Sequence, residues 1–381
     1  MEDVAAREIE ELLKAKAASV EVSDMAVSFE AKNLLELCRF SYLTQSAARV
    51  LFLLKSFEIC PNFEEAKAIA EKQLEEIHIG EWVSKETKFK VECRREGEQD
   101  FTSQAMAEWL ADVIGKVIQK ETGIEPAADL KEPNFIIYAL VVDKTMHIGI
   151  DMAGFDISKR DYKVNSHMPS IKGNIGYALL RITGFEKKMG MVDLSSFSGI
   201  VPIEAAFYAT DRPVNYFRKR ELHFTRFPNL KDTDFEKFFS DIDGKIKDKA
   251  KGEIFCIANH LRFISAAKSN SKIAGVNKSI TFSRFDVEWI DTKFDKGSVE
   301  VMASNGPRVS KQNEAFIGKY YNELFYQANY ILKKTGKIGI LTNSLDVVKA
   351  AAEKAHFKLS HERKLWQGDE GLMIGVFEKA G

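Results

Sequence analysis

One stretch of this 381-residue chain combines an acid, small residues and a glycine directly after a short apolar run. Asp193 follows that run, and a serine-rich turn leads from it to Ser198 and Gly199. Pro202 then suits the first turn of a helix. A turn of this kind between a strand and a helix is a place where the backbone can approach a ligand closely.

A second stretch carries an amide and a cation after another apolar run. Residues 298–303 read as a strand, and Asn305, Gly306, Pro307 and Arg308 follow it. By itself the Asn-Gly pair is typical of an ordinary turn. If the strand is parallel to the one before Asp193, however, both stretches lie at the same edge of one sheet, where ligands bind.

The elements around these stretches alternate between strands and helices from about residue 167. We expect strands at 191–194, 254–257, 279–282, 298–303 and 338–341, with helices near 170–183, 201–210, 233–248, 261–274, 312–334 and 344–356. Two further strands, 356–364 and 371–378, form a closing hairpin. This alternation predicts a doubly wound, mostly parallel sheet with an antiparallel edge hairpin.

The first 152 residues follow a different pattern. We expect a helix at 4–16, strands at 19–22 and 26–30, a helix at 31–40 and a strand at 49–57, which together suggest a small α+β unit. A second unit follows, with helices at 63–76 and 103–122 and strands at 88–94, 135–142 and 146–152. Thr102 and Ser103 are candidate caps of the longer helix.

The turn after Asp193 resembles the first motif of S-adenosylmethionine-dependent RNA methyltransferases that carry a THUMP domain. It is most similar to the archaeal and bacterial group that makes N2-methylguanosine in the tRNA acceptor stem. The positions that agree are Asp193, Ser198, Gly199, Pro202, Ile203, Glu204 and Ala205. Residues 89–101, 133–142, 149–154 and 158–164 look like successive THUMP segments, and 220–228 and 266–276 resemble methyltransferase segments. The likeness is collinear over essentially the whole chain.

The resemblance implies an α/β fold in three parts. An N-terminal ferredoxin-like α+β subdomain (1–58) and a THUMP RNA-binding domain (59–158) precede a Rossmann-like class I methyltransferase domain (159–381). It also implies S-adenosylmethionine as cofactor and tRNA as partner, bound at the 3′ end and acceptor stem through shape, phosphates and 2′-hydroxyls.

Several site positions depart from the family pattern. Phe197 stands where the family has a glycine, and its ring would fill cofactor space or pack in a side cluster. Ala258 stands where an acid binds the ribose hydroxyls, whereas Asp286, expected near the adenine amino group, is retained. In the family's target-binding stretch, Asn305 and Pro307 are kept, while the first proline is Gly306.

At the last position of that stretch, Arg308 replaces the tyrosine that stacks on the flipped base. Arginine can also stack on a base, so it is a partial substitute. Asn305, Pro307 and Arg308 are therefore the implied catalytic positions. Asp193, Phe197, Ser198, Gly199, Ala258 and Asp286 are the implied cofactor positions.

Basic residues interleaved with a tyrosine are candidates for RNA contact. They are Arg94, Arg95, Lys159, Arg160 and Tyr162. The seven histidines form no HxH or HxxxH pair, and the four cysteines are scattered, so the pattern predicts no metal site and no disulfide scaffold.

The composition predicts a soluble, cytoplasmic protein. The formal net charge is −1, which excludes a uniformly basic protein that coats nucleic acid. The N-terminus is charged and unlike a signal peptide, and the longest apolar run, 135–142, is far shorter than the roughly 20 residues that span a bilayer.

Two functions follow from these observations. The first is a tRNA-binding protein whose methyltransferase domain has lost or weakened S-adenosylmethionine binding, which serves as a chaperone or as the RNA-binding partner of an active subunit. It rests on the joint changes at Phe197, Ala258 and Arg308. The alternative is an active tRNA guanine-N2 methyltransferase that acts on the acceptor stem.

Overall fold

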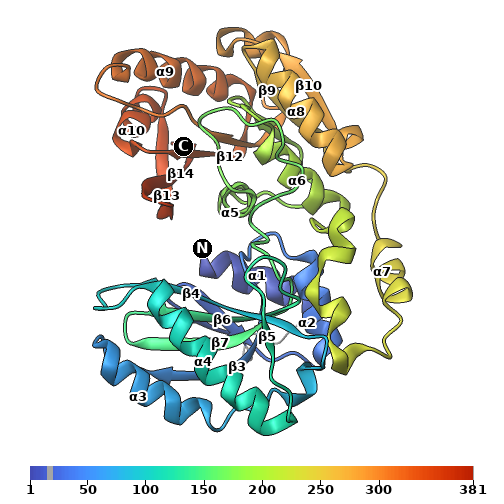
Figure 1. The fold of residues 1–381 in the computed structure, drawn as a ribbon. Coiled ribbons are helices and arrows are strands. Elements are labelled where there is room, and N and C mark those ends of the chain that lie inside the picture. Colours follow the sequence, from blue (N-terminus) through green and yellow to red (C-terminus); the bar gives the residue numbers. More distant parts are fainter. Residues whose placement is uncertain (15–19, 381) are drawn as a thin grey trace. The chain divides into compact units, whose positions relative to one another are not determined.

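The computed structural model describes residues 1–14 and 20–380 and divides into two compact units. The N-terminal unit contains Glu2–Ile157 and Asn215–Ser240. The C-terminal unit contains Ser158–Val214 and the chain from Asp241 onward. Figure 1 shows the course of the chain through both.

The N-terminal unit is built on a five-stranded sheet in the order β3-β7-β6-β4-β5. Its strands are β3 (Leu51–Glu58), β4 (Lys88–Glu96), β5 (Ala127–Ala128), β6 (Phe135–Val142) and β7 (Thr145–Asp151). Helices α3 (Phe63–Leu74) and α4 (Ser103–Thr122) lie on the same side of this sheet (Figure 1). Thr102 caps α4 as predicted, because its hydroxyl accepts a hydrogen bond from the backbone N–H of Ala105 at 3.1 Å.

The strands within the first 58 residues belong to two different sheets. Strands β1 (Val20–Ser23) and β2 (Ala26–Phe29) pair only with each other, near α1 (Glu2–Leu13) and α2 (Leu34–Leu43). Strand β3 instead pairs along its length with β7. The ferredoxin-like subdomain predicted for 1–58 is thus divided, and its last strand belongs to the sheet of the following segment. The predicted helix end at 15–16 and strand start at 19 lie outside the described residues.

The C-terminal unit contains a seven-stranded sheet in the order β10-β9-β8-β11-β12-β14-β13. Its strands are β8 (Met191–Asp193), β9 (Ile254–Ala258), β10 (Ile280–Arg284), β11 (Val299–Asn305), β12 (Leu332–Thr342), β13 (Phe357–Gln367) and β14 (Glu370–Lys379). The first five are mutually parallel, and β14 pairs antiparallel with β12 and β13. This confirms the predicted mostly parallel sheet with a closing hairpin.

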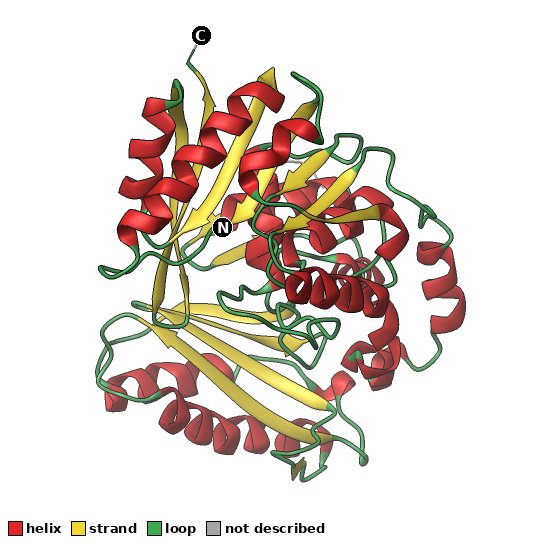
Figure 2. Ribbon diagram, turned by 90° about the horizontal axis from the view of Figure 1, so that it is seen from above, coloured by secondary structure: helices red, strands yellow, loops and turns green. Residues whose placement is uncertain are grey.

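Helices flank the strands of this sheet (Figure 2). They are α5 (Gly173–Thr183), α6 (Ile200–Thr210), α8 (Leu261–Ala274), α9 (Glu314–Ile331) and α10 (Leu345–Lys354). Helix α9 ends earlier than predicted, because Leu332 already pairs with Val299 as the first residue of β12. Strand order reverses between β8 and β11, so the loops after these two strands diverge at a topological switch point.

A segment after α6 leaves the C-terminal unit. It contains short 3-10 turns at Tyr216–Glu221, His223–Arg226 and Pro228–Leu230, and then α7 (Phe235–Asp243). The backbone N–H groups of His223 and Phe224 donate to the carbonyls of Ala153 and Met152 at 3.1 and 3.0 Å. Residues 215–240 therefore belong to the N-terminal unit, although the sequence predicts one continuous domain from 159 to the end.

Candidate functional site

Asp193 ends β8 and anchors the loop after it. Its carboxylate is buried and accepts a hydrogen bond from the backbone N–H of Ser195 at 3.1 Å. Burial raises the pKa of Asp193 to about 6, while hydrogen bonds from the Ser196 side chain, the Ser195 backbone and the Ser304 side chain lower it. These hydrogen bonds tie the loop to the end of β8 from within.

Gly199 forms the turn from this loop into α6. Its φ of +79° lies in the left-handed region, and a Cβ there would lie 2.8 Å from the Cβ of Ala267 on α8. Both facts require glycine at this position. The preceding carbonyl, that of Ser198, accepts a hydrogen bond from the side chain of Asn270 at 2.9 Å, so the turn is also tied to α8.

The ring of Phe197 packs edge-on against Phe263 in the first part of α8. The ring centroids are 5.2 Å apart and the planes meet at 74°. His167 and His260 contact Phe263 in the same way, at 5.2 and 5.7 Å. The side chain thus lies in an aromatic cluster on α8, the second of the two placements that the sequence allows.

The carboxyl ends of β9 and β10 carry the next two candidates. Ala258 is the buried last residue of β9, and exposed Asn259 and His260 follow it. Asp286 comes two residues after β10 and is exposed at the start of the 3-10 turn Val287–Thr292. This edge therefore offers a carboxylate after β10, whereas β9 ends without one.

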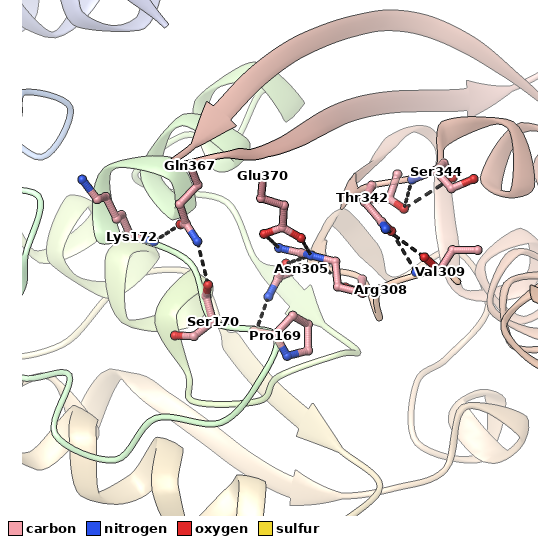
Figure 3. A network of polar contacts seen from close by, with 12 residues as sticks. Pro169, Ser170, Lys172, Asn305, Arg308, Val309, Thr342, Ser344, Gln367 and Glu370 are labelled. Carbon is pink, nitrogen blue, oxygen red and sulfur yellow. Dashed lines mark hydrogen bonds and ion pairs between the residues drawn. The ribbon is translucent and has the colours of Figure 1, made fainter. Parts of the chain in front are cut away.

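Asn305 is the buried last residue of β11, and both ends of its amide are engaged (Figure 3). The Nδ2 group donates to the carbonyl of Pro169 at 3.0 Å. The Oδ1 atom accepts from Nη1 of Arg308 at 3.1 Å. The amide is thus held in one orientation, with its carbonyl toward the guanidinium.

The guanidinium of Arg308 is shared between Asn305 and a carboxylate. Its Nε and Nη2 groups donate to the two oxygens of Glu370 at 2.5 and 3.3 Å (Figure 3). The N–H groups of Arg308 are therefore occupied by hydrogen-bond acceptors, and stacking of its flat face on a base stays a prediction. Pro307, the residue before Arg308, is half-buried. Glycine is required at position 306, because a Cβ on that residue would lie 2.1 Å from the hydroxyl of Tyr321.

A segment that the sequence does not mark as functional, 165–172, contacts both the loop after β8 and the end of β11. The backbone N–H of His167 donates to the hydroxyl of Ser198 at 3.1 Å. Farther along, the side chain of Gln367 accepts from the N–H of Lys172 and donates to the carbonyl of Ser170, at 2.8 and 2.9 Å (Figure 3). The segment therefore links the β8 loop to the β13–β14 hairpin.

Two of the predicted RNA contacts are buried instead. Arg160 forms a two-pronged ion pair with Glu204, with N–O distances of 2.8 and 3.0 Å, and the hydroxyl of Tyr162 donates to the same carboxylate at 2.8 Å. All three side chains are buried within the C-terminal unit. The prediction that Arg160 and Tyr162 contact RNA is therefore wrong, because both side chains bind the buried carboxylate of Glu204 instead.

The other three predicted RNA contacts are accessible. Arg94 and Lys159 are exposed, and Arg95 is half-buried and donates to the side chain of Gln99 at 3.2 Å. Contact of these residues with RNA stays a prediction.

The described residues contain neither a metal site nor a membrane-spanning helix. No group of three or more histidine, cysteine, aspartate or glutamate side chains is placed to hold a metal ion. No helix is both long and apolar enough to pass through a bilayer.

Comparison with known proteins finds likeness over both units. Residues 160–370 match the family model described as RMKL-like, methyltransferase domain, and residues 62–151 match the THUMP domain. A curated relative is the tRNA (guanine(6)-N2)-methyltransferase of Methanocaldococcus jannaschii, 26% identical over 349 residues, which cover 89% of this chain and 87% of that protein.

Solved structures share the fold. TrmN from Thermus thermophilus superposes with a TM-score of 0.72 at 19% identity, over 99% of this chain and 96% of the other. The structure of SMU.472 complexed with SAH superposes with a TM-score of 0.79 at 20% identity, over 99% and 95%.

The buried Glu204 carboxylate yields a stability prediction. Glu204→Gln removes the buried charge that pairs with Arg160, so we expect the free energy of unfolding to fall by roughly 3–5 kcal/mol in urea denaturation. The control is Glu362→Gln, which breaks an exposed ion pair with Lys349 and is expected to cost less than about 1 kcal/mol. Equal effects of the two variants would contradict a structural role for the buried triad.

Proposed function

The chain belongs to the RMKL-like methyltransferase family, with a THUMP domain ahead of the methyltransferase domain, and from this premise we propose that it methylates the N2 amine of a guanine in tRNA. The Methanocaldococcus jannaschii relative supports this, since it carries that activity in its name and aligns across both domains. Of the two functions that the sequence suggests, the active methyltransferase is therefore the better supported.

The observation that carries the proposal is the amide of Asn305. It lies at the end of β11, beside the switch point, and Pro169 fixes its orientation through the Nδ2 group. Its Oδ1 atom is thereby available to accept a hydrogen bond from an exocyclic amine, once the Arg308 guanidinium moves aside. Holding the amine in line is most of the required catalysis, because methyl transfer depends mainly on alignment of the reacting atoms.

The residues at the carboxyl ends of β8, β9 and β10 fit S-adenosylmethionine with one departure. The cofactor supplies the methyl group. Gly199 keeps the tight turn after β8, and exposed Asp286 supplies an acceptor after β10. At Ala258 a carboxylate for the ribose is absent, so exposed Asn259 and His260 would offer neutral hydrogen bonds there instead.

The proposed substrate is tRNA, gripped by the THUMP-containing N-terminal unit. Arg94 and Arg95 in that unit, with Lys159, are the accessible cations that would contact phosphates. The acceptor stem as the modified region is part of the same proposal.

A second candidate function is favoured by two specific observations. The end of β9 lacks a carboxylate at Ala258, and Arg308 already occupies the carbonyl of Asn305. A protein that binds tRNA and assists a separate active subunit would need neither a carboxylate at position 258 nor an accessible carbonyl on Asn305.

Methyl transfer tests the proposed function directly. We expect the purified protein to transfer labelled methyl groups from S-adenosylmethionine to unmodified tRNA, and Asn305→Ala to lower the rate at least a hundredfold, because an orienting hydrogen bond is lost. The control is Asn329→Ala, an exposed asparagine on α9. No incorporation by the unaltered protein would favour the second candidate.

Cofactor affinity gives a further test. Ala258→Asp restores a ribose acceptor, and a charge-assisted hydrogen bond is worth about 1.5–3 kcal/mol, so calorimetry is expected to show S-adenosylmethionine binding roughly tenfold to a hundredfold tighter. Asn329→Asp is the matched control, since it adds the same charge at an exposed position on α9. An equal gain in both variants would indicate general electrostatic attraction rather than a ribose contact.

A further inference from the structure

Glu370 holds a flat, forked donor beside the amide of Asn305. Its two carboxylate oxygens accept from Nε and Nη2 of Arg308, and Nη1 of the same guanidinium reaches Oδ1 of Asn305 (Figure 3). The side chain of Arg308 is 17% exposed and that of Glu370 39%, so the pair is accessible from solvent on one side. The site thus already accommodates a planar group that has two parallel N–H donors.

The carboxylate is held there by the closing hairpin. Glu370 is the first residue of β14 and pairs with Gln367, the last residue of β13. Gln367 in turn hydrogen bonds to the backbone of Ser170 and Lys172, in the segment that also orients Asn305 through Pro169. The backbone of Glu370 and the amide of Asn305 are therefore both tied to segment 169–172 by bonds that do not involve Arg308.

The edge of one nucleobase matches this fork. Guanine presents N1–H and the N2 amine side by side, as a guanidinium does, and a carboxylate can accept both hydrogen bonds in parallel. Adenine and cytosine have an acceptor where guanine has N1–H, and uracil flanks its single N–H with carbonyls. A carboxylate at this position would therefore select guanine among the four bases.

We propose that Glu370 recognises the Watson–Crick edge of the target guanine and that Arg308 occupies the same place when RNA is absent. This inference rests on the proposed function, since it names how the same site selects its base. When the flipped guanine enters, Arg308 swings away and Glu370 accepts from N1–H and one N2–H. The N2 amine is then held next to Oδ1 of Asn305, as the guanidinium is now.

Nucleotide binding tests the recognition without methyl transfer. The probes are guanosine 5′-monophosphate, inosine 5′-monophosphate, which lacks the N2 amine, and 2-aminopurine riboside 5′-monophosphate, which lacks N1–H. In Arg308→Ala, where Glu370 is unpaired, we expect calorimetry to show guanosine binding about tenfold to a hundredfold tighter than either analogue. In the unaltered protein guanosine is expected to bind more weakly than in Arg308→Ala.

A second variant separates a carboxylate effect from a change in folding. In Arg308→Ala/Glu370→Gln, the glutamine amide can donate to N1 of 2-aminopurine, so the preference for guanosine over 2-aminopurine is expected to disappear. The matched control is Arg308→Ala/Glu362→Gln, altered on the neighbouring strand β13, which should keep it. Thermal unfolding of all variants verifies that they are folded.

The outcomes distinguish this inference from the proposed function. Equal binding of the three nucleotides by Arg308→Ala, or no binding at millimolar concentration, overturns the role of Glu370. If tRNA is methylated but tRNA with 2-aminopurine at the target position is methylated equally well, the inference fails and the proposed function stands. If guanosine is preferred but no methyl group is transferred to tRNA, the inference stands and the proposed function fails.

Discussion

The site depends on the parallel pairing of β8 with β11 at the point where strand order reverses. Met191 and Val192 lie beside Val301 and Met302, and the backbone N–H of Leu194 donates to the hydroxyl of Ser304 at 3.0 Å. This pairing brings Asp193 and Asn305 to the same edge, although they are more than a hundred residues apart in the chain. His167, Pro169 and Glu370 are in turn placed by hydrogen bonds to residues of these two loops.

Local pattern predicted much of this arrangement. Apolar runs bounded by turn residues located the strands, and the residues after them, Asp193, Ala258 and Asn305, do lie at strand ends. Gly199 has the positive φ that its place before a helix suggests. These features follow from local sequence, because strand ends and helix starts are determined within a few residues.

The features that the sequence did not predict depend on distant partners. Glu370 accepts a hydrogen bond from Arg308, which is 62 residues away in the sequence, and Gln367 donates one to Ser170, which is 197 residues away. Arg160 and Tyr162 look like surface residues until Glu204 is brought between them by the fold. Residues 215–240 likewise join the N-terminal unit through backbone contacts that no periodicity reveals.

The residues of the loop after β11 that depart from the family pattern each have a partner that accommodates them. Gly306 leaves room for the Tyr321 hydroxyl, Arg308 brings a positive charge, and Glu370 neutralises it. A half-buried arginine without a counter-charge would be costly, so Glu370 stabilises Arg308 in this loop.

The pairing of Arg308 with Glu370 also has a consequence for RNA binding. A free carboxylate in a site that receives a polyanion would repel the approaching phosphates. While Arg308 holds Glu370, the charges of the two side chains cancel. In the recognition proposed above, the carboxylate is uncovered only when a base has entered with donors that can replace the guanidinium. Under the proposed recognition, base selection can therefore coexist with binding of a polyanion, because the guanidinium covers the carboxylate until the base replaces it.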